Sequence, residues 1–467
     1  MTDINKNIDI NRDIYENMRH WKERNSIDKV LYIQGTRQVG KTYAIKKFAK
    51  DNYSSDKIIY IDLTSDDLEI LLRIRENINN ELIDEKLERS EINRINELFT
   101  RFTRKFEDSP ECLVIIDEIQ ESSEIFSMIR QFARDVKANF IITGSYLGRI
   151  LGDKKFWISM GDMIDITMNP VSFEEYLGIF KLRELYNSLD FYGKSNKTDY
   201  DLISDKFNEY IKIGGYPRAI IEHLGENSDK IEYIIEDILN RFCEESFSYI
   251  SDSIMNLEVL QQSFVIITSI MLNEKEGLTE DSLSEELKKN LYKDYSSNIG
   301  KASVNSALNW IFKSGIVKFC NKVIEMDYNK FKSNQRMYFN DLGLFRTLSN
   351  KLKVTDGEVN GLICEHFVFN CMNYDKLRYP SFASYKGGEV DFVYLNKFTK
   401  ELYGIEVKAG SNSGKSITKA LNDGKINKAI YCKGNTYGGI DGKIITIPIY
   451  LFSRFMREIL NRNNTLI

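Results

Sequence analysis

Cysteine and histidine are scarce in this chain, and their scarcity excludes two kinds of site. Six cysteines are spread over 467 residues without a Cys-x-x-Cys pair, a pattern typical of reduced, buried thiols in a cytoplasmic protein. Only three histidines occur, so we expect no zinc site. Any metal chemistry must then rest on carboxylates, which favour Mg²⁺ or Mn²⁺.

Long hydrophobic runs are also missing. The run IITIPIYLF at 444–452 has the length of a strand, well below the roughly 18 residues of a membrane span. The first residues, MTDINKNIDINRD, are polar and of mixed charge, so no signal peptide is expected. We therefore expect a cytoplasmic protein without a membrane partner. Proline is rare, with five residues, and no proline-rich linker marks a domain boundary.

Charge is distributed unevenly along the chain. The formal net charge is −5. Residues 361–467 hold 15 Lys and Arg against 9 Asp and Glu, a balance of +6, which leaves −11 for the rest. A positive C-terminal segment on an acidic protein suggests an anionic partner at that end.

The first third of the chain alternates between short apolar runs and helical stretches. A charged helical stretch at 67–107 separates the second run from the third. This alternation predicts an α/β fold class with a buried parallel sheet. The five expected strands are VLYIQ (30–34), IIYIDL (58–63), CLVIID (112–117), NFIITG (139–144) and MIDITM (163–168).

A glycine-rich loop follows the first expected strand and precedes a helix. The run GTRQVGKT at 35–42 has the spacing Gly-x-x-x-x-Gly-Lys-Thr of a P-loop, whose backbone N–H groups surround nucleotide phosphates. Lys41 is expected to reach the β- and γ-phosphates and the Thr42 hydroxyl to bind Mg²⁺. A chance glycine turn before a helix is the alternative. The residues expected to contact ATP are Gly35, Thr36, Arg37, Gln38, Val39, Gly40, Lys41, Thr42 and Tyr43.

An acidic pair ends the third expected strand. Asp117 is expected to hold Mg²⁺ and Glu118 to orient the attacking water. The pair could instead cap the next helix. Because IIYIDL lies between the two motifs in sequence, the P-loop strand and the acidic strand are not expected to be neighbours by order alone. ATPases with a catalytic glutamate have this layout.

Residues 257–346 predict three helices followed by a two-stranded hairpin, the order of a winged helix. Side chains expected on the recognition helix are Lys301, Asn305 and Asn309, and Lys318 and Lys322 lie near the wing. Such modules enter the DNA major groove. A lid or a protein-docking surface is the alternative, because the segment is not strongly basic.

A second acidic constellation occupies the C-terminal segment. Asp391 on one expected strand and Glu406-x-Lys408 on the next, with Glu365 on the preceding helix, resemble the PD-(D/E)xK nucleases. In that fold the acidic residues converge on Mg²⁺, and the lysine stabilises developing charge. Lys386, Lys415 and Lys419 add positive charge nearby. Two alternatives stay open: an exposed Glu/Lys pair on an edge strand, and a nuclease fold without activity.

Longer motifs resemble the prokaryotic AAA+ ATPases of the archaeal-ATPase type, in which an ATPase core precedes a C-terminal domain of unknown function. The matching segments in the first half are WKERNSIDKVLYIQGTRQVGKT, LVIIDEIQ, IITGSYLG, MNPVSFEEYL and IGGYPRAI. Those in the second half are RMYFNDLGLF, GLICEHFVFN, GGEVDFVYL and GIEVKAG.

The resemblance implies further roles around the nucleotide. Thr143, at the end of the fourth strand, would contact the γ-phosphate, and a buried turn threonine is the alternative. Arg149, Arg218 and Arg241 are candidates for an arginine finger. Many relatives have Gly-Arg before the fifth strand, where this chain has Gly161-Asp162. One plausible finger is therefore absent.

We predict an α/β protein made of a P-loop AAA+ core (1–170), a helical lid (171–250), a winged helix (251–346) and a restriction-endonuclease-like, PD-(D/E)xK nuclease-like domain (347–467). The expected cofactors are ATP and Mg²⁺, with Mn²⁺ as a second choice at the C-terminal site. DNA is the expected partner, while a protein docked on the winged helix and a homo-oligomer are further arrangements to test. The alternative function is an ATP-driven regulatory switch that binds DNA or protein and has a silent nuclease fold.

Overall fold

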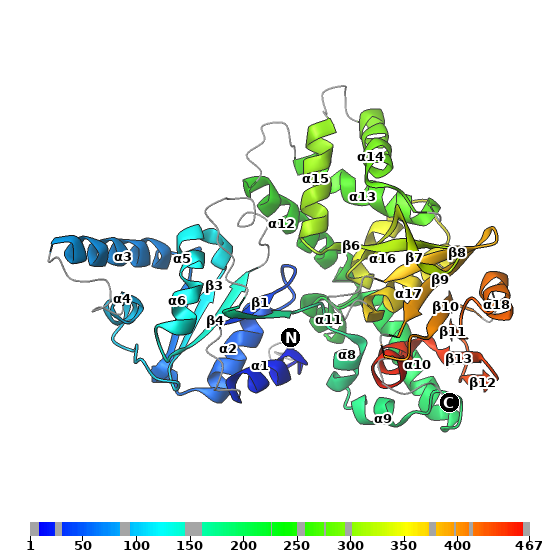
Figure 1. The fold of residues 1–467 in the computed structure, drawn as a ribbon, viewed down its shortest axis with the longest axis horizontal. Coiled ribbons are helices and arrows are strands. Elements are labelled where there is room, and N and C mark those ends of the chain that lie inside the picture. The colour runs from blue at the N-terminus through cyan, green and yellow to red at the C-terminus, as the bar shows by residue number, and fades with distance from the viewer. Residues whose placement is uncertain are drawn as a thin grey trace. The chain divides into compact units, whose positions relative to one another are not determined.

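The computed structural model divides the chain into two compact units, residues 11–169 and residues 1–10 with 170–467. We call them the first and the second unit and treat each by itself (Figure 1). None of the described helices is long and apolar enough to cross a membrane. The structure describes residues 9–23, 30–84, 94–144, 161–225, 227–249, 257–274, 277–294, 301–372, 380–396, 398–410 and 414–460.

The first unit is built on a parallel sheet. Its described strands follow the order β2-β3-β4-β1-β5, and all neighbours are parallel. This confirms the predicted α/β class, and every expected strand is present to within one residue at each end. The P-loop strand β1 and the acidic strand β3 are separated by β4, as expected. The strands are β1 (Val30–Gln34), β2 (Ile58–Asp62), β3 (Leu113–Asp117), β4 (Asn139–Gly144) and β5 (Met163–Thr167).

Several helices of this unit bury apolar side chains in one core with the strands of this sheet. The insertion predicted as helical at 67–107 is helical at 67–84 and 94–102, and Phe99 within it packs against Phe132 and Phe140 in the core. Helix α1 lies beside α2 (Figure 1). The helices are α1 (Ile14–Glu23), α2 (Lys41–Asn52), η2 (Ser55–Lys57), α3 (Asp67–Asp84), α4 (Arg94–Phe102), η3 (Ile119–Glu121), α5 (Ser123–Ser127) and α6 (Ile129–Arg134).

The second unit begins with helices. They start at Ser172, which forms a capping box with Glu175 and thereby satisfies two backbone donors. The helices up to residue 313 are α8 (Phe173–Ile179), α9 (Arg183–Ser188), α10 (Lys197–Ile213), α11 (Pro217–Leu224), η4 (Ser228–Lys230), α12 (Ile231–Tyr249), α13 (Leu257–Asn273), α14 (Glu280–Asp294) and α15 (Lys301–Lys313). Those that follow are α16 (Leu342–Asn350), α17 (Asp356–Met372), α18 (Lys415–Asn422), η5 (Ile449–Leu451), α19 (Phe452–Phe455) and η6 (Met456–Leu460).

A mixed sheet spans the second half of this unit. Its described strands follow the order β12-β13-β11-β10-β9-β8-β6-β7. The hairpin β6–β7 joins the C-terminal strands, because β6 pairs in parallel with β8. The segments predicted as a winged helix and as a nuclease-like domain therefore share one sheet. The strands are β6 (Val317–Ile324), β7 (Asp327–Phe339), β8 (Ser381–Tyr385), β9 (Gly388–Leu395), β10 (Leu402–Lys408), β11 (Lys428–Lys433), β12 (Gly439–Asp441) and β13 (Ile444–Pro448).

Three elements of the second unit differ from the sequence-based expectation. The run 444–452 is not one strand, because β13 ends at Pro448 and the chain turns into η5. Helix α16 was not predicted; Asp341 caps it by accepting a hydrogen bond from Leu344 N at 2.8 Å. The short strand β12 was not predicted. It lies at the edge of the sheet, pairs only with β13 among the described strands, and is too exposed to show an apolar run.

Two glycine motifs lock together at Asp341. Asp341 Oδ2 accepts a hydrogen bond from Gly215 N at 2.6 Å. Gly214 has φ 80°, and a Cβ there would lie 2.5 Å from the backbone N of Gly343. Only glycine allows this conformation and this approach at once. The motifs IGGYPRAI and RMYFNDLGLF thus form one buried joint between α10 and α16.

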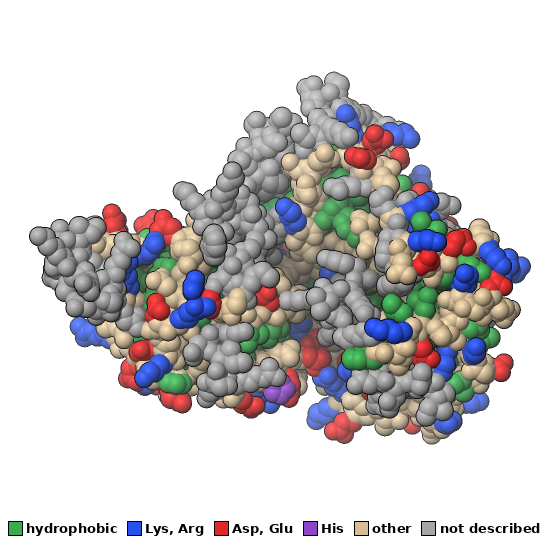
Figure 2. Space-filling model, viewed as in Figure 1, with side chains coloured by type: hydrophobic (Ala, Val, Ile, Leu, Met, Phe, Trp, Pro, Cys, Tyr) green, Lys and Arg blue, Asp and Glu red, His purple; other side chains and the backbone are tan. Residues whose placement is uncertain are grey.

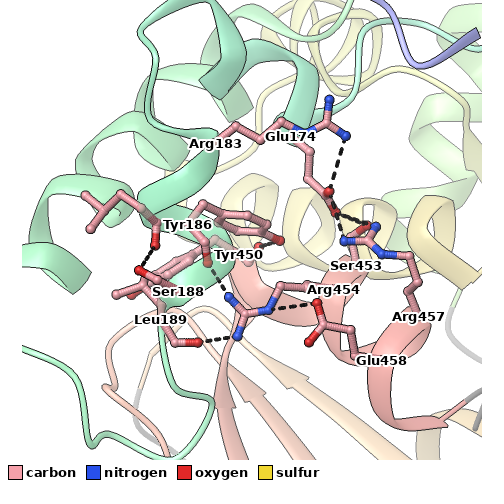
Figure 3. A network of polar contacts seen from close by, with 11 residues as sticks. Glu174, Arg183, Tyr186, Ser188, Leu189, Tyr450, Ser453, Arg454, Arg457 and Glu458 are labelled. Atoms are coloured by element: carbon pink, nitrogen blue, oxygen red, sulfur yellow. Dashed lines mark hydrogen bonds and ion pairs between the residues drawn. The ribbon is translucent and has the colours of Figure 1, made fainter. Parts of the chain in front are cut away.

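The C-terminal helices are tied to α8 and α9 (Figure 3). Arg457 forms a two-pronged ion pair with Glu174, at 3.0 and 3.1 Å. The buried guanidinium of Arg454 donates to the backbone carbonyls of Tyr186 and Leu189. These contacts join segments more than 260 residues apart, so the second unit closes on itself.

Candidate functional site

The P-loop of the first unit runs from the end of β1 to the start of α2. Gly40 has φ 93°, a left-handed conformation that glycine adopts without strain. Gln38 has φ 60°, which is unusual for a residue with a side chain and typical of a constrained loop. The positive φ angles of Gln38 and Gly40 bend the backbone around the start of α2, where the helix dipole favours an anion.

Lys41 lies buried under this loop. Its ammonium Nζ donates to the carbonyls of Gly35 and Thr36 at 3.0 and 3.1 Å. Burial lowers the pKa of Lys41 to about 8, although the nearby Glu118 and Asp117 carboxylates oppose the shift. The ammonium of Lys41, which is predicted to bind phosphates, therefore already lies within the loop.

Asp117 ends β3 and lies against Thr42. The Thr42 hydroxyl donates to Asp117 Oδ2 at 2.9 Å, and the Tyr60 hydroxyl donates to the same oxygen at 2.6 Å. Asp117 Oδ1 accepts from the backbone N of Glu118 at 3.1 Å. A hydroxyl and a carboxylate side by side are oxygen donors of the kind Mg²⁺ prefers.

Glu118 follows in a left-handed conformation, with φ 55° and ψ 51°. Its side chain is half-buried, and its Oε2 accepts a hydrogen bond from the side-chain amide of Gln120. A left-handed conformation is uncommon for a residue with a side chain, and the extended backbone of β3 ends just before it, at Asp117. Glu118 is thus held beside, and not within, the sheet.

Thr143 lies on β4, between β1 and β3. It pairs with Ile33 of β1 and stands one step beyond the Ile142–Ile116 pair, at the level of Asp117. Its side chain is fully buried, and its hydroxyl has no hydrogen-bond partner among the described residues. A buried, unpaired hydroxyl at this level is a candidate contact for a ligand.

The other residues predicted for this site are placed as follows. Val39 is buried, whereas Tyr43 is 59% exposed on α2. Arg218 and Arg241 both pair with Asp237, so each arginine-finger candidate has a structural partner in the second unit. Arg149 lies outside the described residues.

The departure at Asp162 has a structural counterpart. Asp162 is buried and accepts a hydrogen bond from Arg134 Nε at 2.7 Å. Where relatives were expected to have an arginine, this chain therefore has an acidic residue that pairs with an arginine of α6.

Sequence reasoning missed Tyr60 and Gln120. Tyr60 could not be singled out, because any aromatic residue in a buried strand is first expected to be core. Gln120 lies two residues after Glu118 in the acidic motif. This short separation was the only indication in the sequence that Gln120 could contact Glu118.

The C-terminal constellation forms on the mixed sheet. Glu365 lies on α17, Asp391 on β9, and Glu406 and Lys408 on β10, in the predicted order of elements. Lys408 Nζ lies 2.8 Å from Glu406 Oε1 and 3.7 Å from Asp391 Oδ2. Asp391 Oδ2 also accepts from the backbone N of Val407 at 2.7 Å.

Burial controls the protonation of this cluster. It raises the pKa of Glu365 to about 8, with the Asp391 charge adding to the shift. Burial and the Asp391 charge also raise the pKa of Glu406 to about 7, against the pull of Lys408. At neutral pH this cluster therefore holds protons that ordinary carboxylates have lost.

The metal prediction for Glu365, Asp391 and Glu406 stays a prediction. Their oxygen atoms suit Mg²⁺ chemically, and Glu406 Oε2 is buried without a hydrogen-bond partner among the described residues. However, no three His, Cys, Asp or Glu side chains in the described part of the chain lie close enough to hold one ion. The spacing thus does not fit a preformed metal site.

Three helices and a hairpin precede this cluster, as the sequence predicts. Helices α14 and α15 stand side by side next to α13 (Figure 1), and Leu278 bridges to Gln335 of β7. Asn305 and Asn309 are exposed on α15, with Asn305 Oδ1 accepting from Ser284 at 2.6 Å.

The lysines near the hairpin are less available than expected. Lys322 is buried, with its ammonium over the Phe382 ring, and Lys318 is partly buried, with a pKa lowered to about 8 by burial. The helix Lys301–Lys313 begins at Lys301, whose side chain lies outside the described set. Exposed polar side chains on this module include Asn305 and Asn309 of α15.

Comparisons with known proteins divide the chain further. Residues 27–177 match the family model "AAA domain", and residues 204–355 match a family described as "domain of unknown function (DUF8612)". The second match runs across the boundary predicted at 250. No curated protein matches this chain.

Several solved structures are similar at low scores. The Aeropyrum pernix ORC1 protein, solved in complex with DNA, is 14% identical over 73% of this chain and 93% of its own, with a TM-score of 0.32. The Pyrobaculum aerophilum Cdc6p has 12% identity, 74% and 97% coverage and a TM-score of 0.24. The Aquifex aeolicus DnaA bound to AMPPCP has 14% identity, 65% and 88% coverage and a TM-score of 0.27. At these scores the likenesses carry no argument about function. The family evidence thus comes from residues 27–177, which match the AAA domain.

Proposed function

We propose that the first unit binds ATP with Mg²⁺ and hydrolyses it. The observation that carries the proposal is the contact between Thr42 of the P-loop and Asp117 of β3. A P-loop threonine and a strand-ending aspartate meet in this way where they share a magnesium ion. The match of residues 27–177 to the AAA domain supports it.

Each residue of the site has a task in this proposal. Lys41 leaves the Gly35 and Thr36 carbonyls and binds the β- and γ-phosphates, while the P-loop amides surround them. Thr42 and Asp117 hold Mg²⁺, which when bound neutralises charge developing on the phosphates. Glu118 orients the attacking water and takes its proton. The unpaired Thr143 hydroxyl contacts the γ-phosphate or this water.

The bond between Gln120 and Glu118 bears on turnover. In the structure this amide occupies Glu118 Oε2. A carboxylate oxygen that accepts a hydrogen bond from an amide is less available to accept one from the attacking water. Glu118 therefore acts fully only when this bond is released.

We further propose that the protein acts on DNA through the second unit. Support comes from the helix–helix–helix–hairpin order with the Leu278–Gln335 bridge and from the exposed Asn305 and Asn309 on α15. On the face seen in Figure 2, however, Lys and Arg side chains alternate with Asp and Glu. The alternative of a protein partner on the same module is therefore kept, as is a homo-oligomer.

The order of the C-terminal elements around Asp391, Glu406 and Lys408 supports a nuclease-like fold. The missing three-ligand cluster among the described residues favours the switch alternative, with a silent nuclease fold, over metal-dependent cleavage. Isothermal titration with Mg²⁺ or Mn²⁺ separates the two. Heat that disappears in Asp391→Ala, measured with Lys41→Ala to silence the P-loop, supports a C-terminal metal site.

Titration of ATP in the presence and absence of Mg²⁺ tests the main proposal. The wild-type protein should bind more tightly with Mg²⁺, and Thr42→Val should lose this gain while keeping its affinity for ATP in EDTA. Lys41→Ala should lose binding under both conditions. Equal affinity of wild-type protein and Thr42→Val in Mg²⁺ would refute the assigned ion site.

A further inference from the structure

A buried arginine before the first helix contacts the phosphate-binding loop. Arg12 lies two residues ahead of α1, and its guanidinium Nη1 donates to the carbonyl of Val39 at 2.9 Å. Val39 is the residue before Gly40 in the P-loop. Twenty-seven residues separate the two partners, so this contact is tertiary.

The position of Arg12 is fixed by helix packing. Helix α1 buries Ile14, Tyr15, Met18 and Trp21 and packs on α2, the helix that begins with Lys41. At the far end, the ammonium of Lys22 donates to the Asn52 carbonyl at 2.5 Å. The packing of α1 on α2 and the Lys22–Asn52 hydrogen bond therefore hold Arg12 next to the loop.

The direction of the bond matters for phosphates. A peptide is planar and trans, so the carbonyl of Val39 and the N–H of Gly40 point in opposite directions. When Arg12 holds the carbonyl on one side, the Gly40 N–H is presented on the other side. Phosphate binding by a P-loop requires such inward N–H groups.

The same guanidinium has a second contact. Arg12 Nη2 donates to the carbonyl of Asn169 at 2.6 Å, and Asn169 is the last residue of the first unit. The residue before it, Met168, donates its N–H to Gln34 O at 2.7 Å. A Cβ on Gly35 would lie 2.2 Å from Met168 O, so the backbone of 168–169 runs directly against the loop.

We propose that Arg12 is a positioning residue for nucleotide phosphates. It fixes the Val39–Gly40 peptide with the N–H toward the phosphates and fastens the loop to Asn169, where the chain leaves the first unit. The proposal rests on nucleotide binding at the P-loop, as proposed above. Arginine suits this role because its planar fork directs two donors to two carbonyls at once.

ADP affinity and steady-state ATP hydrolysis of Arg12→Met test this role. We expect the Kd for ADP and the KM for ATP to rise by about tenfold, since hydrogen bonds from charged groups are lost, while kcat stays within about twofold. A merely structural role would instead lower kcat through loss of active protein and leave KM unchanged. Arg12→Lys should be intermediate, because one ammonium does not replace the two-donor fork.

Arg101→Met is the matched control. Arg101 also makes a two-pronged contact, with Glu81, but it lies on α4 and should keep wild-type ADP affinity. Wild-type affinity in Arg12→Met overturns the proposal for Arg12 alone. If Arg12→Met does not fold, Arg12→Lys decides in the same way. If the wild-type protein itself binds no ADP, the P-loop function and the role of Arg12 fall together.

Discussion

Several polar side chains of the nucleotide site are hydrogen-bonded within the protein. Lys41 is bonded to loop carbonyls, Asp117 to Thr42 and Tyr60, and Glu118 to Gln120. Each of these bonds satisfies a buried polar group that would otherwise be costly. Nucleotide binding must therefore exchange partners, and the pH and ion dependence of binding report on that exchange.

Lys41 gives the site a pH dependence. Because burial lowers its pKa to about 8, the ammonium is mostly charged at pH 7 and mostly neutral at pH 9. Phosphate binding needs the charged form, so the Kd for ATP should rise by about tenfold between pH 7 and pH 9. Lys41→Arg stays charged over this range and should show a flat profile at lower affinity. A flat wild-type profile would contradict the lowered pKa of Lys41.

At the scale of elements, the carboxylate cluster between α17, β9 and β10 should make stability depend on pH. Glu365 and Glu406 have pKa values of about 8 and about 7, above those in an unfolded chain. Between roughly pH 4.5 and pH 8 the folded state therefore holds more protons than the unfolded state, and stability falls as pH rises.

Glu406→Gln tests this account. The wild-type free energy of unfolding, measured in urea, should drop by about 2 kcal/mol from pH 5.5 to pH 8 through Glu406 alone. The variant should show a clearly smaller drop, because its amide does not titrate. Asp201→Asn, on α10, is a control that should retain the wild-type slope. Parallel slopes for wild-type protein and Glu406→Gln would exclude Glu406 as a cause.

The contacts of the C-terminal helices with α8 and α9 should stabilise the folded state by as much as several hydrogen bonds. Arg454→Met leaves the carbonyls of Tyr186 and Leu189 buried without their donor, which should cost about 2–4 kcal/mol of unfolding free energy. Arg183→Met removes a longer, more exposed ion pair to Glu174 and should cost under about 1 kcal/mol. Chemical denaturation measures the unfolding free energy of both variants. Equal losses would show that Arg454 stabilises the fold no more than the more exposed Arg183 does.

Local pattern was sufficient to predict the elements of the first unit. Buried parallel strands are continuous apolar runs, and the Gly-x-x-x-x-Gly-Lys-Thr spacing fixes its own context. The P-loop and the Asp117 contact could therefore be predicted from sequence. Arg12 could not, because nothing near residue 12 indicates that α1 will bring it to Val39.

The local sequence pattern could not predict which distant strands pair with each other. Nothing in β6 or β8 specifies that the two strands pair, since each reads equally well as the edge of its own domain. The helix α16 was missed because its cap, Asp341, also serves a tertiary contact with Gly215. Residues 449–452, which are helical in the structure, continue an apolar run and were predicted as part of a strand, because periodicity cannot separate short buried helices from strands.

At the scale of the whole molecule, the shared sheet changes how DNA binding can be tested. Removing residues from 361 onward would strip β8 from β6 and the Arg454 contacts from α9, so a truncation would damage the rest of the second unit. Substitutions on exposed lysines are cleaner. Lys415 and Lys419 are exposed on α18, in the segment with the +6 balance.

DNA affinity should fall with salt, and the double variant Lys415→Glu, Lys419→Glu should reduce the log–log slope by about 2 if both contact phosphates. The exposed Lys105 and Lys137 of the first unit, changed in the same way, form the matched control and should leave the slope unchanged. Fluorescence anisotropy with labelled duplex from 50 to 300 mM salt measures both. Equal slopes in the two double variants would place phosphate contacts outside α18.

The central claim is that Asp117, Thr42 and Glu118 form a hydrolytic Mg-ATP site, and Glu118→Gln tests it most directly. ATP binding and steady-state phosphate release should be measured on the same preparation with Mg²⁺. We predict that the variant binds ATP with close to wild-type affinity and releases phosphate at least about a hundredfold more slowly, because a catalytic base contributes roughly 10²–10⁴ to the rate. Phosphate release by Glu118→Gln at the wild-type rate would contradict the account.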